Sequence, residues 1–150
     1  MKNFFIVTFI FIFCIFSFAT SSKGEGLAYD FSLNDLGGQR INLSDFRNKQ
    51  EVILFFWASW CAFCRRELRN LIDKYPALKK DNIEVLAVNI EESAKVVQRF
   101  LAREKIEFKV LLDSEGTVAV IYGIVGIPTY IWIDKEGKIK YKGHALPEEE

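Results

Sequence analysis

Hydrophobic and polar positions along the chain predict strands and helices in turn. Residues 52–57 form an uninterrupted apolar run, which is typical of a strand buried on both faces of a sheet. After a short turn, apolar residues recur at helical spacing from Ala62 onward, which predicts a helix. Its buried stripe consists of Leu68, Leu71, Ile72 and Tyr75. We expect Pro76 to bend this helix or to end it at Tyr75.

The remainder of the chain continues this pattern. The predicted elements are a β-rich strand at 83–88, a helix with an apolar stripe at 96–101, an extended segment at 108–112, a short helix, and a hairpin of strands 129–133 and 138–142. Whether 108–112 is a strand or a loop stays open. Asp113 or Ser114 should cap the short helix, which is expected to bury Val118, Ile121 and Tyr122.

A small hairpin is predicted ahead of the first buried strand. Residues 29–33 and 39–43 read as two short strands around a turn at 34–38, and Ser44 is expected to cap a helical turn. Strand–helix–strand units followed by a terminal hairpin predict an α/β fold with a mixed central sheet and helices on both faces. We expect a linker at 23–28 and one domain over 29–150.

Residues 1–22 differ from the rest in composition. Lys2 is the only charged side chain before Lys23, and residues 4–18 are almost entirely apolar, which predicts a signal peptide or an N-terminal membrane anchor. Small residues at 17–21 suit cleavage, but the apolar run is only slightly short of a membrane span of about 20 residues. Both outcomes predict export to a periplasmic or extracytoplasmic compartment, and a retained leader would tether the protein through residues 4–18.

Charge and composition narrow the chemistry. The chain of 150 residues has 20 basic and 20 acidic side chains, so no basic surplus indicates nucleic-acid binding. It has three cysteines and one histidine, and no phosphate-binding glycine motif. Cys14 lies within the leader and is interpreted as a small hydrophobic residue. The candidate chemistry therefore rests on Cys61 and Cys64.

These two cysteines lie where the buried strand passes into the predicted helix. The first helical turn offers unpaired N–H groups and the positive end of the helix dipole, which should lower the pKa of the Cys61 thiol. Their spacing puts Cys64 on the same helix face, where it can attack a mixed disulfide on Cys61. The pattern predicts a thiol–disulfide exchange site that needs no further cofactor.

Two other uses of the cysteine pair stay open. A zinc site requires four ligands, and only Cys14 and His144 could add to the pair, so we expect no metal. A purely structural disulfide is the second alternative, although a helix start beside Trp60 is an activating setting.

The chain contains two motifs, FWASWCAFCRRE at residues 56–67 and GIPT at residues 126–129. With these motifs the chain resembles the thioredoxin superfamily. It is most similar to the exported TlpA/ResA-like thiol–disulfide oxidoreductases, in which the hairpin at 30–44 is an N-terminal extension. The resemblance covers residues 29–143 and implies a thioredoxin-like fold.

The resemblance also assigns roles to the cysteines and their neighbours. Cys61 corresponds to the nucleophile and Cys64 to the resolving cysteine. Glu67 corresponds to a glutamate near the dithiol, and it could accept the Cys64 proton. An ordinary surface glutamate paired with Arg65 or Arg66 is the alternative interpretation.

Three residues are expected to bind substrate. Pro128 corresponds to a cis-proline that faces the dithiol, and Ile127 to the residue beside it that contacts the substrate chain. We therefore predict a cis Ile127–Pro128 peptide bond in a loop packed against Cys61. Trp60 is expected to shape the same surface.

The sequence departs from the family pattern at two places. Ala62 and Phe63 separate the cysteines, where the family usually has proline before the second, so the redox potential is not implied. The family also normally ends in a helix after the last hairpin. Here either a stub begins at Pro147, or one sheet face is uncovered and exposes apolar surface, or the sequence is a truncated form.

The family implies a reductant of exported protein disulfides, for example of apocytochrome c cysteines before haem attachment, that receives electrons from a membrane-embedded donor. A disulfide oxidase or isomerase of the same fold is an alternative. A redox-inactive module that holds an extended chain beside Pro128 is another. A peroxidase of this fold would have threonine three residues before its cysteine, where this chain has Ala58.

Overall fold

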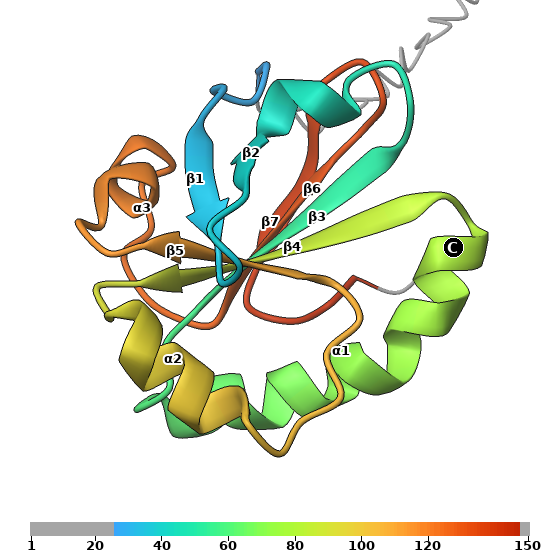
Figure 1. Ribbon diagram of the computed structural model, residues 1–150. Helices are drawn as coiled ribbons and strands as arrows, with labels where there is room; N and C mark the ends of the chain where they lie inside the picture. The colour runs from blue at the N-terminus through green and yellow to red at the C-terminus, as the bar shows by residue number, and fades with distance from the viewer. Residues whose placement is uncertain (1–25, 148–150) are drawn as a thin grey trace, which may run out of the picture.

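Seven strands form one sheet in the computed structural model, which describes residues 26–147 (Figure 1). The strands are β1 (Ser32–Asp35), β2 (Arg40–Asn42), β3 (Glu51–Trp57), β4 (Ile83–Ile90), β5 (Lys109–Asp113), β6 (Thr129–Ile133) and β7 (Ile139–Gly143). The helices are the 3-10 helix η1 (Leu43–Phe46) and the α-helices α1 (Ala62–Lys80), α2 (Ala94–Leu101) and α3 (Thr117–Ile121). The predicted leader lies outside the described residues, and within them no helix is both long and apolar enough to span a bilayer.

The sheet is mixed, as the sequence predicted. Its strand order is β2-β1-β5-β4-β3-β6-β7. The central strands β3, β4 and β5 are parallel, whereas β1, β2, β6 and β7 run antiparallel to their neighbours. The extended segment left open by the sequence is strand β5, which pairs with β4 on one side and β1 on the other. The carboxyl ends of the parallel strands β3 and β4 therefore lie side by side at the same end of the sheet.

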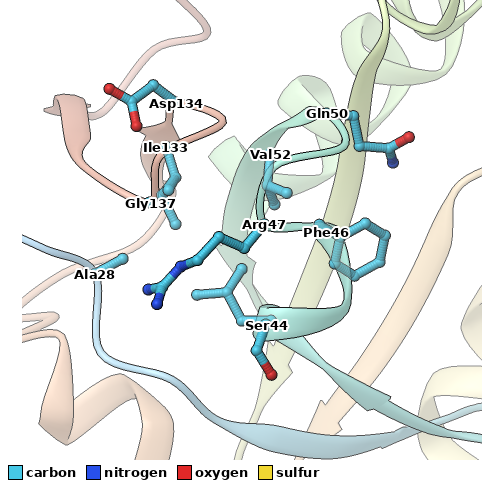
Figure 2. Close-up of a pocket in the computed structure, with 10 residues that line it drawn as sticks. Ala28, Ser44, Phe46, Arg47, Gln50, Val52, Ile133, Asp134 and Gly137 are labelled. Atoms are coloured by element: carbon cyan, nitrogen blue, oxygen red, sulfur yellow. The ribbon is translucent and has the colours of Figure 1, made fainter.

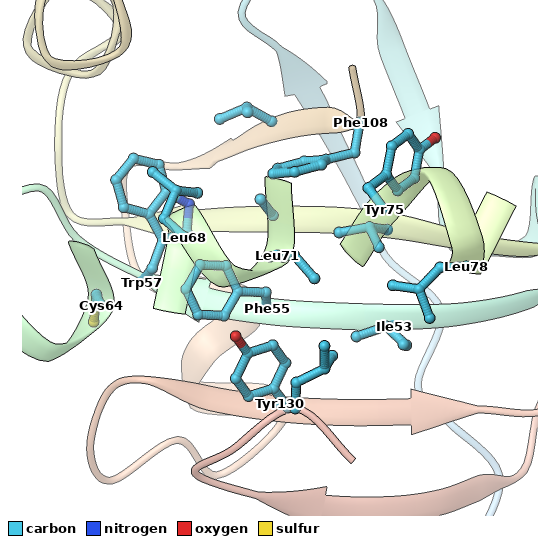
Figure 3. Packing of buried hydrophobic residues seen from close by; sticks show 14 of the residues in the cluster. Ile53, Phe55, Trp57, Cys64, Leu68, Leu71, Tyr75, Leu78, Phe108 and Tyr130 are labelled. Atoms are coloured by element: carbon cyan, nitrogen blue, oxygen red, sulfur yellow. The ribbon is translucent and has the colours of Figure 1, made fainter. Parts of the chain in front are cut away.

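Alternating residues of β3 bury opposite faces of the sheet. Ile53, Phe55 and Trp57 pack into the core beneath α1 and α2, as Figure 3 shows in part. The residues between them pack into a second core beneath α3 and η1. A strand buried on both faces needs a continuous apolar run, which is why the pattern at 52–57 predicted it correctly.

Helix α1 does not end at Tyr75. It continues through Pro76 to Lys80 and is capped by the backbone of Asp81. Proline removes one backbone donor from the helix, but the turn after it still buries Leu78 beside Tyr75 in the core (Figure 3). This packing outweighs the lost hydrogen bond, so the alternative that the helix ends there is wrong.

The N-terminal hairpin is shifted from its predicted position. Strand β1 begins at Ser32, and the residue that caps η1 is Asn42 instead of Ser44. Asp45 accepts a hydrogen bond from the Asn42 backbone at 3.1 Å, which completes a capping box. Ahead of it, Leu27 bridges to Lys138 and buried Ala28 donates to Gly137, so the last part of the predicted linker is bound to the sheet.

Helix α3 is held by the end of β5. The Asp113 carboxylate accepts hydrogen bonds from the backbone N–H groups of Val118 (3.2 Å) and Ala119 (2.8 Å). The N-cap residue of the helix is Gly116, which corrects the predicted cap at Asp113 or Ser114. Val118 and Tyr122 are buried, but Ile121 is exposed, which corrects the prediction for that residue. The helix has only five residues, so one face of it can contact the sheet.

Strand β7 forms one edge of the sheet and is covered by polar contacts. Lys140 is an extra residue opposite the step from Trp132 to Ile133, which makes a β-bulge. The Lys140 ammonium lies 4.4 Å from the Trp132 ring centroid and 2.9 Å from the Glu51 carboxylate. Leu146 is buried against the same core. Among the described residues, no large apolar side chain of β6 or β7 is exposed.

A small apolar cavity lies at the start of β3 (Figure 2). Arg47 lies across it, against Gly137, whose φ of 88° suits a residue without a side chain. The cavity has a volume of about 10 Å³, which is that of one water-sized sphere, so it cannot hold a substrate. The cavity is at the opposite end of β3 from Cys61 and has no part in the dithiol chemistry.

Candidate active site

The two cysteines are joined in a disulfide at the start of α1, with their Cα atoms 5.2 Å apart. Cys61 is the N-cap of the helix, and its sulfur accepts a hydrogen bond from the Cys64 backbone N–H at 3.1 Å. Cys61 is 7% exposed, whereas Cys64 is 0% exposed. Of the two bonded cysteines, only Cys61 keeps any exposed surface, as expected if Cys61 reacts first.

The loop before β6 packs against this disulfide. The Ile127–Pro128 peptide bond is cis, which confirms the prediction. The Cys61 sulfur lies 3.8 Å from the carbonyl oxygen of Ile127, so the loop and the dithiol are in contact. Pro128 is buried and Ile127 is half-buried. The structure thus brings together two segments that are far apart in the sequence, as the two motifs predicted.

Glu67 lies three residues after Cys64 and is largely buried. Its side chain is only 15% exposed, and it accepts a hydrogen bond from the Tyr130 hydroxyl at 3.2 Å. Burial raises the pKa of Tyr130, and the negative charge of Glu67 raises it further, so this hydroxyl stays protonated. Arg66 lies 3.8 Å from the other carboxylate oxygen. The carboxylate is therefore part of the interior, with one arginine contact at its edge.

A second carboxylate, which the sequence interpretation missed, fixes the loop before Cys61. Glu92 accepts hydrogen bonds from the Ser59 backbone N–H (2.7 Å), the Ser59 hydroxyl (2.5 Å) and the Asn89 side-chain amide (2.7 Å). Asn89 is fully buried at the end of β4, directly opposite Trp57. The sequence did offer an indication of this contact, because Asn89 directly follows the apolar run 85–88 and a buried amide requires a hydrogen-bond partner.

The side chains beside the disulfide in the sequence are apolar and exposed. Trp60 is 68% exposed and Phe63 is 64% exposed, while Trp57 is buried in the core. Trp60 thus lies where a substrate-contacting residue is expected, and Trp57 supports the sheet. Phe63, which sequence reasoning treated only as a departure from the family, projects from the same helical turn as the disulfide.

His144, the only histidine of the chain, anchors the cis-proline loop. Its Nδ1 lies 2.8 Å from the carbonyl oxygen of Pro128 and 3.4 Å from the Thr129 hydroxyl. The last backbone pair between β6 and β7 joins Tyr130 to Gly143. The His144 side chain then links the residue after β7 to the cis-proline loop before β6. Within residues 26–147, no three histidine, cysteine, aspartate or glutamate side chains are grouped so that they could hold a metal ion.

Residues 26–142 match the model of the AhpC/TSA family. Thiol-disulfide oxidoreductase ResA from Geobacillus thermodenitrificans is 40% identical over 113 residues, which are 75% of this chain and 64% of the relative. This chain therefore spans less than two thirds of that relative's length. Thiol-disulfide oxidoreductase ResA from Bacillus thuringiensis subsp. konkukian is 34% identical over 81% of this chain and 71% of its own length.

Among solved structures, the thioredoxin domain of a thiol-disulfide oxidoreductase from Bacteroides vulgatus has the same fold. Its TM-score to this chain is 0.74 at 27% identity, and the match covers 82% of this chain and 89% of that domain. The architecture of this chain therefore has a solved counterpart.

Proposed function

The chain belongs to the AhpC/TSA family and has a thioredoxin-like fold, and on this premise we propose that it is a thiol–disulfide oxidoreductase that acts on other proteins. Cys61 is the nucleophile and Cys64 the resolving cysteine. The observation that carries the proposal is a Cys61–Cys64 disulfide at a helix start, in which Cys61 keeps some exposed surface and Cys64 keeps none. A structural disulfide has no need of a partly exposed cysteine beside an exposed aromatic residue.

The reaction follows from this geometry. In the reduced protein the Cys61 thiolate attacks one sulfur of a substrate disulfide, which forms a mixed disulfide and expels the first substrate thiolate. Cys64 then attacks the Cys61 sulfur, so the Cys61–Cys64 disulfide forms and the second substrate thiolate leaves. Two electrons pass to the substrate, and each expelled thiolate takes up a proton. The Cys64 N–H that contacts the Cys61 sulfur would stabilise the attacking thiolate.

Glu67 supplies a route for the second proton. Cys64 is buried, so it has no direct access to water for releasing its proton. A carboxylate one helical turn away can accept that proton as the mixed disulfide is resolved. The Tyr130 hydrogen bond holds the Glu67 side chain in place beneath the helix. Trp60, Ile127 and Pro128 then form the surface on which the substrate chain lies.

The direction of transfer and the compartment complete the proposal. The protein is exported, with residues 1–22 as a signal peptide or anchor, and it works as a reductant supplied by a membrane-embedded dithiol donor. Apocytochrome c cysteines are the example of a substrate that the family resemblance implies. The similarity to proteins named ResA supports the chemistry, and the apolar leader supports export. Buried Ala58, at the place where a peroxidase of this fold would have threonine, makes peroxide reduction the weaker alternative.

Trapping tests this function directly. In a Cys64→Ser variant, a mixed disulfide on Cys61 cannot be resolved, so the variant should accumulate covalent complexes with exported proteins that separate on adding dithiothreitol. A Cys61→Ser variant is the matched control and should trap nothing. Equal trapping by both variants, or none by either when the wild-type protein fails to reduce insulin, would exclude the proposed function.

A further inference from the structure

Exposed apolar side chains stand on both segments that meet at the Cys61 sulfur, the start of α1 and the loop before β6. Trp60 comes from the loop before α1 and Phe63 from its first turn. Val125, which is 99% exposed, stands two residues before Ile127, whose carbonyl contacts the sulfur. Val125 therefore stands on the same loop that contacts this sulfur. Single exposed apolar residues are ordinary, but three on the two segments that meet at the disulfide indicate a contact surface.

The exposed charges on the first two turns of α1 are positive. Arg65, Arg66 and Arg69 are exposed on the first two turns of α1, and the first turn has no acidic residue. Glu67, the only acid among them, faces Tyr130 with one carboxylate oxygen and lies 3.8 Å from Arg66 with the other, whereas Arg65 and Arg69 lie elsewhere on the exposed face. Cations near a helix N-terminus oppose the helix dipole, so this arrangement does not serve the stability of the helix.

The cations and Phe63 form one continuous surface. The Arg66 guanidinium lies 5.4 Å from the centroid of the Phe63 ring, within the range of a cation–π contact. A chain segment that covers Phe63 therefore also passes beside Arg66. Charge complementarity then selects an acidic partner, because a basic segment would meet like charges at the same place.

We propose that this surface selects a flexible polypeptide segment whose cysteine is flanked by an apolar residue and an acidic residue. The apolar residue packs against Phe63, Trp60 and Val125, and the acidic residue pairs with Arg65 or Arg66. A flexible segment is required because a disulfide held in a rigid surface could not reach the sulfur of a cysteine that is only 7% exposed. This inference rests on the proposed oxidoreductase function and specifies its substrate class.

Four peptides of equal length, each with an intrachain disulfide, test the inference. They combine either leucine or serine with either aspartate or lysine beside the cysteines, and 2-hydroxyethyl disulfide serves as a neutral reference. The rate constant for oxidation of the reduced protein should be about tenfold higher for leucine than for serine, and about tenfold higher for aspartate than for lysine, at low salt. The charge preference should fall to about threefold in 0.5 M NaCl, because salt screens exposed charges.

Two variants assign these preferences to the named residues. A Phe63→Ser variant should lose the preference for leucine, and an Arg65→Gln/Arg66→Gln variant should lose the preference for aspartate. The control is Arg103→Gln/Lys105→Gln, which removes two exposed charges from the loop ahead of β5, at the far end of the sheet. Ratios of peptide rates within one variant cancel any change in the reactivity of the dithiol, and circular dichroism verifies the fold.

The possible outcomes distinguish a failure of the proposed substrate selection from a failure of the proposed oxidoreductase function. If the reference disulfide is reduced but all four peptides react equally, or if the variants keep the wild-type ratios, the selection is refuted and the oxidoreductase function stands. If neither peptides nor reference are reduced, the oxidoreductase function itself fails.

Discussion

Replacing Glu92 by alanine should destabilise the protein and slow its reaction with disulfides. This carboxylate accepts three hydrogen bonds, two from Ser59 and one from Asn89, and Ser59 lies two residues before Cys61. The substitution removes all three acceptor contacts and leaves the donors in place. The loop that carries the nucleophile then loses its connection to the end of β4.

The expected magnitude follows from how deeply each donor is buried. Asn89 is fully buried, and a buried donor left without an acceptor costs about 1–3 kcal/mol. Ser59 is half-buried, so its two donors recover part of their loss through water. We expect the free energy of unfolding to fall by about 2–4 kcal/mol in the Glu92→Ala variant.

Glu92→Gln is the matched control. One carboxylate oxygen accepts from the Ser59 N–H and from Asn89, and the other accepts from the Ser59 hydroxyl. A glutamine can place its oxygen at the first position and its amide at the second, where the hydroxyl rotates to accept. All partners then stay satisfied, and the loss of charge alone should cost about 1 kcal/mol.

Urea unfolding of the three proteins gives the free energies, and reduction of insulin gives the rates. Glu92→Ala should be both less stable and slower, while Glu92→Gln stays near the wild type in both. A Glu92→Ala variant that lost less than about 1 kcal/mol, or a Glu92→Gln variant as unstable as the alanine variant, would refute the proposed role of this carboxylate.

Three further predictions follow from the dithiol, the core and the buried tyrosines. In the reduced protein, Cys61 should react with iodoacetamide well below the ordinary thiol pKa of about 8.5 and Cys64 should not; equal pH profiles for the two, resolved by peptide mass spectrometry, would remove the helix-start argument. Leu71→Ala should lower the free energy of unfolding in urea by about 2–5 kcal/mol, because Leu71 is fully buried on the inner face of α1; a loss below about 1 kcal/mol would contradict the packing. Stability should also fall as the pH rises above about 10, since the unfolded chain then releases tyrosine protons that the folded protein retains; unfolding in urea at pH 9 and pH 11 measures this, and an unchanged free energy would contradict it. Burial raises the pKa of the three tyrosines concerned, Tyr75, Tyr122 and Tyr130.

The sequence predicted the parts of the fold in which local pattern and tertiary packing agree. The apolar run of β3 has only one compatible environment, and the N-cap position of Cys61 followed from the strand–turn–helix pattern. The cis bond before Pro128 was predicted from the combination of two motifs. Each of these depends on residues close to one another in the sequence or on a resemblance between motifs.

The parts that the sequence left open or placed wrongly depend on long-range contacts. Strand β5 is short, and only pairing with β1 and β4 distinguishes it from a loop. Helix α1 continues past Pro76 because Leu78 finds a place in the core. Glu92 contacts Ser59 across 33 positions of sequence, so its local environment indicated a helix start and nothing more.

The two edges of the sheet bear on how such a protein avoids aggregating with the chains it handles. Exposed strand edges are templates for pairing with other polypeptides, and a catalyst that meets unfolded proteins would be vulnerable there. Strand β2 has only three residues, and β7 carries a bulge with its lysines directed into local contacts. Neither edge offers a long, flat ladder for an incoming strand. Under the proposed function, a visiting chain would meet the loop beside the dithiol and leave once the disulfide has been exchanged.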